Sequence, residues 1–155
     1  MDTKIKISAT ALRMLLGWFM LFDGIGILLN PNFSAFGFLT NAKTFQGFYS
    51  WFALPMNIGW VDFVNPWAIT LIGVALLLGV GVRVASWAGA LLMIIYYFPH
   101  YDFPAVTHGY IVEEHIIYAA VFVLIALWTP AQEFGFSGML KNSFLGRIPL
   151  LRSIL

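Results

Sequence analysis

Residues 66–98, PWAITLIGVALLLGVGVRVASWAGALLMIIYYF, decide how this chain folds. The stretch is almost entirely apolar and carries one charge, Arg83, close to its centre. A hydrocarbon core of roughly 30 Å is crossed by about 20 apolar helical residues, so the stretch is too long for a single span. A straight helix would also leave Arg83 near the middle of the bilayer, which costs several kcal/mol. The sequence therefore favours two shorter spans over one long one.

The break between these two spans falls just before the arginine. Gly79 and Gly81 loosen the chain there, and Ser86 is a residue that can begin a new helix. We predict a helical hairpin with spans of about 66–82 and 84–98. Its tight turn places the arginine at one face of the membrane.

The composition is that of an integral membrane protein. Apolar residues make up 61% of the chain and charged residues 10%, against about 45–50% and 25% in soluble domains. The mean hydropathy is +0.86. A net charge of +1 gives no basic surface for nucleic acid. The chain has no cysteine, which excludes a disulfide, a thiolate metal site, an Fe–S cluster and a cysteine nucleophile.

A first span of about 8–29 precedes the hairpin and ends at a helix stop, Asn30-Pro31. No cleavage signal follows its apolar stretch, so we expect the span to be retained. Asp23 lies within it, and a carboxylate inside a membrane is a candidate functional residue. The alternative is a carboxylate near the outer end that bonds to a neighbouring helix or reaches water.

Between the first span and the hairpin we expect an aromatic helix over about 40–54. Phe45, Phe48, Tyr49 and Phe52 are spaced to share one helix face. Aromatic rings favour the headgroup level, so this helix should lie in the interface or cap the bundle. It would serve either as an anchoring lid or as the wall of a lipid or quinone pocket.

A fourth span of about 109–129 and an amphipathic basic tail, 131–155, complete the chain. Seven of the eight Lys and Arg residues then lie on one side of the membrane, and only Lys43 lies on the other. By the positive-inside rule both termini are cytoplasmic. The sequence thus predicts an all-α fold, one membrane domain over 1–155, built as a four-helix bundle with an interfacial aromatic helix between spans one and two.

The loop before the fourth span concentrates all three histidines, His100, His108 and His115. His108 and His115 are seven residues apart and share a face if the helix begins early, with Glu114 adjacent. Imidazole and carboxylate groups together can relay protons or bind a metal. The spacing matches no tight metal motif, so we assign no metal, and no histidine on a facing helix supports a haem. The catalytic candidates are therefore Asp23, His108, Glu114 and His115, unless the loop is simply solvated.

Several aromatic side chains are expected on the same side of the membrane as this loop. They either form an interfacial aromatic belt or line the binding site of a ring-shaped ligand. Tyr96, Trp67 and Tyr118 are first of all residues of the aromatic belt. With His100 they are the candidates for contacting a quinone. Aromatic content alone does not separate these two roles.

Three groups of segments resemble the DoxX/DoxD-like family of small four-span membrane proteins. They are LRMLLGWFMLFDGIG (12–26), AITLIGVALLLGVGVRVASWAGALLMI (68–94), and EEHIIYAAVFVLIAL (113–127) followed by FGFSGMLKNSFLGRIPLLRSIL (134–155). The resemblance implies a membrane subunit of a quinone-linked oxidoreductase, such as thiosulfate:quinone oxidoreductase, in a prokaryotic plasma membrane. It implies quinone as cofactor, and other membrane or redox subunits, or further copies of the chain, as partners.

Two other functions stay open at this stage. The first is a non-catalytic assembly or anchoring subunit, which small-residue faces such as Gly73, Ala75 and Gly79 would allow through close helix packing. The second is a small transporter, in which Asp23 and Arg83 would be buried charges along a path. No inverted repeat or pair of broken spans accompanies these charges.

Overall fold

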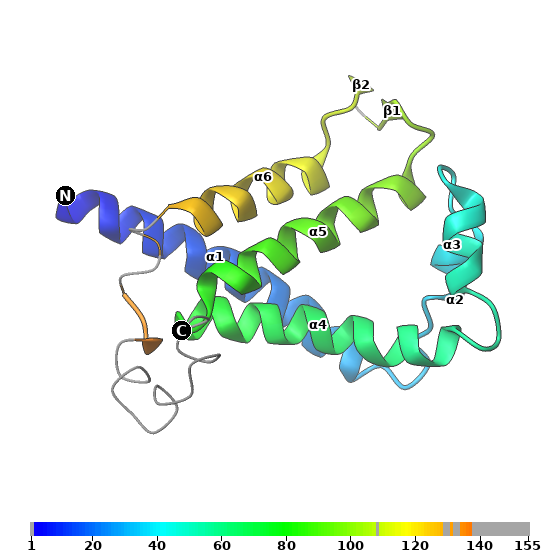
Figure 1. The fold of residues 1–155 in the computed structure, drawn as a ribbon, viewed down its shortest axis with the longest axis horizontal. Coiled ribbons are helices and arrows are strands. Elements are labelled where there is room, and N and C mark those ends of the chain that lie inside the picture. The colour runs from blue at the N-terminus through cyan, green and yellow to red at the C-terminus, as the bar shows by residue number, and fades with distance from the viewer. Residues whose placement is uncertain (1, 108, 129–130, 132–133, 138–155) are drawn as a thin grey trace.

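A computed structural model describes residues 2–107, 109–128, 131 and 134–137. The elements are α1 (Thr3–Leu28), α2 (Phe36–Thr40), α3 (Gln46–Phe52), α4 (Ile58–Leu78), α5 (Val82–His100), β1 (Ala105–Val106), β2 (Gly109–Tyr110) and α6 (Glu114–Leu127). The four longer helices run side by side, and α2 and α3 cover one end of the bundle, which we call the capped end (Figure 1). Helices α1, α4 and α5 are long and apolar enough to cross a membrane, and α6 is a shorter apolar helix. The predicted all-α membrane bundle is confirmed.

Helices α1 and α4 pack so closely that only glycine fits at their crossing. A Cβ added to Gly24 would lie 2.6 Å from the backbone nitrogen of Thr70, and one added to Gly73 would lie 2.7 Å from the Cα of Leu21. Small residues at such crossings let membrane helices gain van der Waals contact. This pair is therefore a rigid part of the bundle.

The predicted hairpin is confirmed at its turn. Helix α4 ends at Leu78 and α5 begins at Val82. Gly79 and Gly81 have φ angles of +66° and +61°, a left-handed conformation that glycine adopts without steric strain. Arg83 is exposed in the first turn of α5.

The start of the second span differs from the prediction. Helix α4 begins at Ile58, so Pro66, expected at the beginning of the span, lies inside the helix. A proline in a helix removes one backbone hydrogen bond, which membrane helices tolerate where other groups satisfy the backbone. One turn later, Thr70 Oγ1 donates to the carbonyl of Pro66 at 2.8 Å, an additional bond to the helix backbone rather than a replacement for the missing one. Earlier in α4, Asp62 accepts the backbone N–H of Ala35 at 2.7 Å and fixes the connection from α1.

The aromatic helix expected over about 40–54 is shorter than predicted, because α3 covers only Gln46–Phe52 and the separate helix α2 precedes it. Helix α3 begins directly after Phe45, whose φ of +54° is left-handed. Tyr49 is buried, whereas Phe45 and Phe48 are exposed, so the expected aromatic stripe does not lie on one surface. Thr44 Oγ1 donates to the carbonyl of Tyr101 at 2.6 Å, which holds this segment against the end of α5.

The predicted fourth span also begins later than expected. Ala105–Val106 and Gly109–Tyr110 form the short antiparallel pair β1–β2, and α6 starts at Glu114. Glu113 is the N-cap of α6, and its side chain accepts the backbone N–H of His115, which sets this start. Most of the predicted tail, 131–155, lies outside the described residues.

Candidate functional site

A cavity of about 400 Å³ opens between α1, α5 and α6 near the capped end of the bundle. We call it the polar cavity. Its polar lining residues are Asp23, Asn30, Tyr96, Glu114 and His115, and its rings include Phe19, Phe22, Phe33 and Tyr118. Asp23 comes from the last third of α1. Glu114 and His115 come from the first turn of α6. The fold therefore brings ionisable groups from both ends of the sequence into one apolar-walled space.

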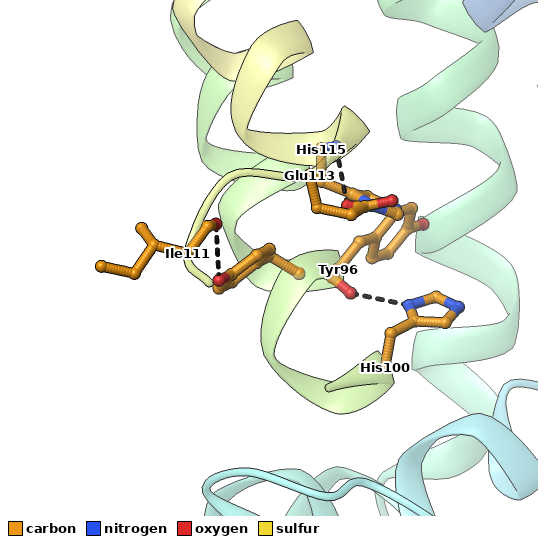
Figure 2. A network of polar contacts seen from close by, with 6 residues as sticks. Tyr96, His100, Ile111, Glu113 and His115 are labelled. Atoms are coloured by element: carbon orange, nitrogen blue, oxygen red, sulfur yellow. Dashed lines mark hydrogen bonds and ion pairs between the residues drawn. The ribbon is translucent and has the colours of Figure 1, made fainter. Parts of the chain in front are cut away.

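His115 is held in a fixed orientation by the residue that caps its helix. Glu113 Oε2 lies 2.7 Å from His115 Nδ1 and also accepts the backbone N–H of His115 at 3.0 Å (Figure 2). Because the carboxylate is an acceptor, Nδ1 carries the hydrogen of this bond. In the neutral ring, Nε2 is then left as the proton acceptor. This arrangement is that of a carboxylate-oriented imidazole.

The same contacts change the acidity of Glu113. Burial raises the pKa of this carboxyl, but bonds from the backbone and ring of His115 and from the Tyr101 hydroxyl act in the opposite direction and outweigh it. The net pKa lies below its ordinary value. Burial raises the pKa of Tyr101, and the hydrogen bond to Glu113 adds to this shift. At neutral pH Glu113 is therefore a carboxylate and Tyr101 a neutral phenol that donates to it.

His100 packs against His115 at the edge of the site. The two ring centroids are 5.3 Å apart, with the ring planes inclined by 34°. His100 Nδ1 lies 3.0 Å from the carbonyl oxygen of Tyr96, one helical turn earlier in α5 (Figure 2). Since His100 is exposed, the ring pair extends from the surface to the lining of the polar cavity.

The structure gathers most, but not all, of the residues that the sequence singles out. Asp23, Glu114, His115, Tyr96 and Tyr118 all line the polar cavity. His100 lies beside them. Trp67 is 45% exposed on α4, where it pairs with the Phe63 ring. His108 lies outside the described residues.

Two residues of the site escaped the sequence analysis. Glu113 is not among the candidates from the sequence, although its place two residues before His115 at a helix start is a capping pattern. Asn65 accepts a hydrogen bond from the Tyr96 hydroxyl. Nothing in the local sequence indicates that contact, because the two residues lie on different helices.

The Glu113, Glu114 and His115 side chains could each offer a metal ion one ligand atom. These atoms lie within 4.8 Å of one another. However, Glu113 Oε2 already forms a hydrogen bond with His115 Nδ1 at 2.7 Å. This arrangement of side chains therefore gives no further reason to place a metal ion here.

Comparison with known protein families gives a match. The DoxX family model matches residues 8–102, more than half of the chain. The matched region runs from α1 through α5 and contains Asp23 and Tyr96, whereas Glu113, Glu114 and His115 follow it. No curated protein and no solved structure matches the chain.

Proposed function

The chain belongs to the DoxX family of membrane proteins, and from this premise we propose that it is a membrane subunit of a quinone-linked oxidoreductase whose polar cavity binds the quinone head. The observation that carries the proposal is the convergence of Asp23, Glu114, His115 and Tyr96 on one cavity. We further propose that both termini are cytoplasmic and that the membrane is a prokaryotic plasma membrane. A redox subunit would bind at the capped end.

The residues present fit a quinone head. Its flat ring suits a cavity with aromatic walls, here Phe19, Phe22, Phe33 and Tyr118. Its two carbonyl oxygens need hydrogen-bond donors, which ionisable side chains can supply. A volume of about 400 Å³ lies within the range of small-molecule sites, about 300–1,000 Å³.

The chain's own residues would hold and transfer protons. When bound, a quinone accepts two electrons from a partner redox subunit together with two protons. His115 can present a protonated Nε2 to the cavity while Glu113 holds the Nδ1 hydrogen. Asp23 and Glu114 are carboxyl groups in the same lining and can take up or release a proton. Positioned groups of this kind typically contribute about 10²–10⁴-fold to a rate.

The test is quinone binding by the full chain in lipid nanodiscs. A benzoquinone with a short alkyl tail is titrated into wild type, Asp23→Asn, His115→Gln and the control Trp67→Phe. We expect the first two variants to weaken binding about tenfold or more, because each replaces an ionisable hydrogen-bond partner of the quinone ring with a neutral amide. Trp67→Phe should bind like wild type, because Trp67 lies outside the cavity. Equal affinity in all four proteins would refute the proposal.

The structure weakens the support for an assembly or anchoring subunit. That alternative depended on small-residue faces that could pack against a partner. Gly73 instead packs against Leu21, and Gly89 lies under the ring of Phe122, both within this chain. Asp23, the charge that suggested a transporter path, is part of the polar cavity.

A further inference from the structure

We propose that a second cavity, next to the polar cavity, binds the isoprenoid tail of the same quinone. This inference rests on the proposed function and extends it to the chain-like part of the ligand. The second cavity has a volume of about 270 Å³ and lies among α2, α3, α4 and α5. Phe38, Phe48, Phe52 and Trp60 are among its walls, and we call it the aromatic chamber.

The aromatic chamber and the polar cavity are neighbours. A side cavity of about 230 Å³ shares Ile27 and Phe33 with the polar cavity, and Phe38 and Asn65 with the aromatic chamber. Tyr96 lines all three spaces. They are therefore neighbouring spaces around one ring, and a ligand in the polar cavity would extend past Tyr96 by way of the side cavity to reach the chamber.

The chamber is chemically suited to a hydrocarbon chain. The Tyr49 hydroxyl donates to the carbonyl of Ile95 at 2.8 Å, and the Tyr96 hydroxyl donates to Asn65. Both hydroxyls in its wall therefore already donate to protein acceptors, and the chamber has no need of a polar ligand. The polar cavity, in contrast, is lined by carboxylates and an imidazole. Together the two spaces match a molecule with a polar ring at one end and an apolar chain at the other.

The chamber also has a route to the membrane. Phe48 is 56% exposed and Trp60 47% exposed on its wall. These two rings lie at the capped end, where aromatic rings favour the membrane interface, so a tail can enter the chamber sideways from the interface. A tail bound in this way remains connected to the lipid phase from which the ligand comes.

The test compares two benzoquinones with the same head, one without a tail and one with a ten-carbon tail. Both are titrated into the full chain in nanodiscs of one lipid composition, so partitioning into lipid is the same for every variant. Ala68→Phe fills the chamber, because Ala68 lines it. Ala88→Phe is the matched control, because Ala88 is exposed on α5.

We expect Ala68→Phe to weaken binding of the tailed quinone about tenfold, which corresponds to the loss of about two buried methylene groups. Binding of the tail-less quinone should stay unchanged, and Ala88→Phe should change neither. If Ala68→Phe left both affinities unchanged, the tail site would be wrong while the proposed function stood. If neither quinone bound to wild type, the proposed function would fail and this inference with it.

Photolabelling of wild type makes the result independent of how the variants fold. A tailed quinone with a diazirine at the end of its tail should label residues of 36–65. Label found only outside the aromatic chamber would overturn the inference. A phospholipid with the same diazirine at its chain end is the second probe. If it labelled the chamber and excess tailed quinone failed to displace it, the chamber would hold lipid and the inference would again be wrong.

Discussion

The four long helices form two pairs, α1 with α4 and α5 with α6, and the contacts within a pair differ from those between the pairs. Helix α1 packs along α4 and α5 packs along α6, whereas the pairs meet mainly through α4 and α5 (Figure 1). Within the pairs glycines bring backbones or rings into close contact, as at Gly73 and Gly89. Between the pairs, bulky and ionisable side chains line the polar cavity. The comparison shows that small residues allow close packing within each helix pair, while large side chains between the pairs line the polar cavity.

The largest expected effect comes from adding one methyl group within a pair. Gly24→Ala places a Cβ 2.6 Å from the backbone nitrogen of Thr70, so α1 and α4 must separate. We expect a loss of about 3 kcal/mol, at the upper end for overpacking, measured as a lower thermal midpoint in detergent.

Gly26→Ala is the matched control, because a Cβ there meets nothing within 4 Å. This variant should be as stable as wild type, or more stable by up to about 1 kcal/mol through better helix propensity. Equal destabilisation by both substitutions would contradict the distinction between the tight crossing and the cavity side of α1.

A smaller loss of stability is expected from a substitution at the contact between the two helix pairs. Asn65→Leu leaves the Tyr96 hydroxyl without its acceptor, which should cost about 2 kcal/mol for an unpaired partly buried donor. Adding Tyr96→Phe to this variant removes the unpaired hydroxyl and should recover most of the loss. A double variant no more stable than Asn65→Leu alone would show that the hydrogen bond is not the cause. The measurement is a double-mutant cycle of thermal midpoints.

A still smaller loss of stability is expected at the start of α6, and this loss should depend on pH. The pKa of Glu113 is lowered in the folded protein from its ordinary value of 4.5. The stabilisation from its charged form is therefore fully present above that value and is lost as the pH falls through the lowered folded-state pKa. Glu113→Gln should cost about 1 kcal/mol at neutral pH and remove this part of the acid dependence. Thermal midpoints between pH 3 and 7 test it, and parallel curves for both proteins would count against the role of Glu113.

The smallest effect on stability is expected from two substitutions that test the orientation of the bundle in the membrane. The chain has no cysteine, so Lys43→Cys and Arg83→Cys each introduce one unique thiol. Both are exposed positions, where a substitution changes stability by less than about 0.5 kcal/mol. A membrane-impermeant maleimide added to intact cells should label Cys at position 43 and not at 83. The reverse pattern would invert the proposed orientation.

Much of the fold followed from the sequence because its signals are local. The apolar run around Arg83 and the glycines before it specify a hairpin without reference to any other element. The position of the histidine-containing loop at one face of the membrane followed from topology alone, whereas only the structure shows that Asp23 and His115 line one cavity.

The remaining features depend on contacts between distant segments. The left-handed backbone at Phe45 divides the aromatic segment, and few residues other than glycine adopt that conformation without tertiary support. The hydrogen bond of Tyr96 to Asn65 joins two helices whose register the sequence does not specify. Glu113 as the partner of His115 depends on where α6 begins, and helix ends are the least predictable part of a helix.

The length of α6 affects the bilayer around the protein. Its 14 residues extend over about 21 Å, which is shorter than a hydrocarbon layer of roughly 30 Å. A membrane adapts to a short apolar helix by thinning beside it. The first turn of α6 carries Glu114 and His115, so the headgroups and their water would bend inward at that side of the protein. The lipid itself would thus deliver water to the mouth of the polar cavity.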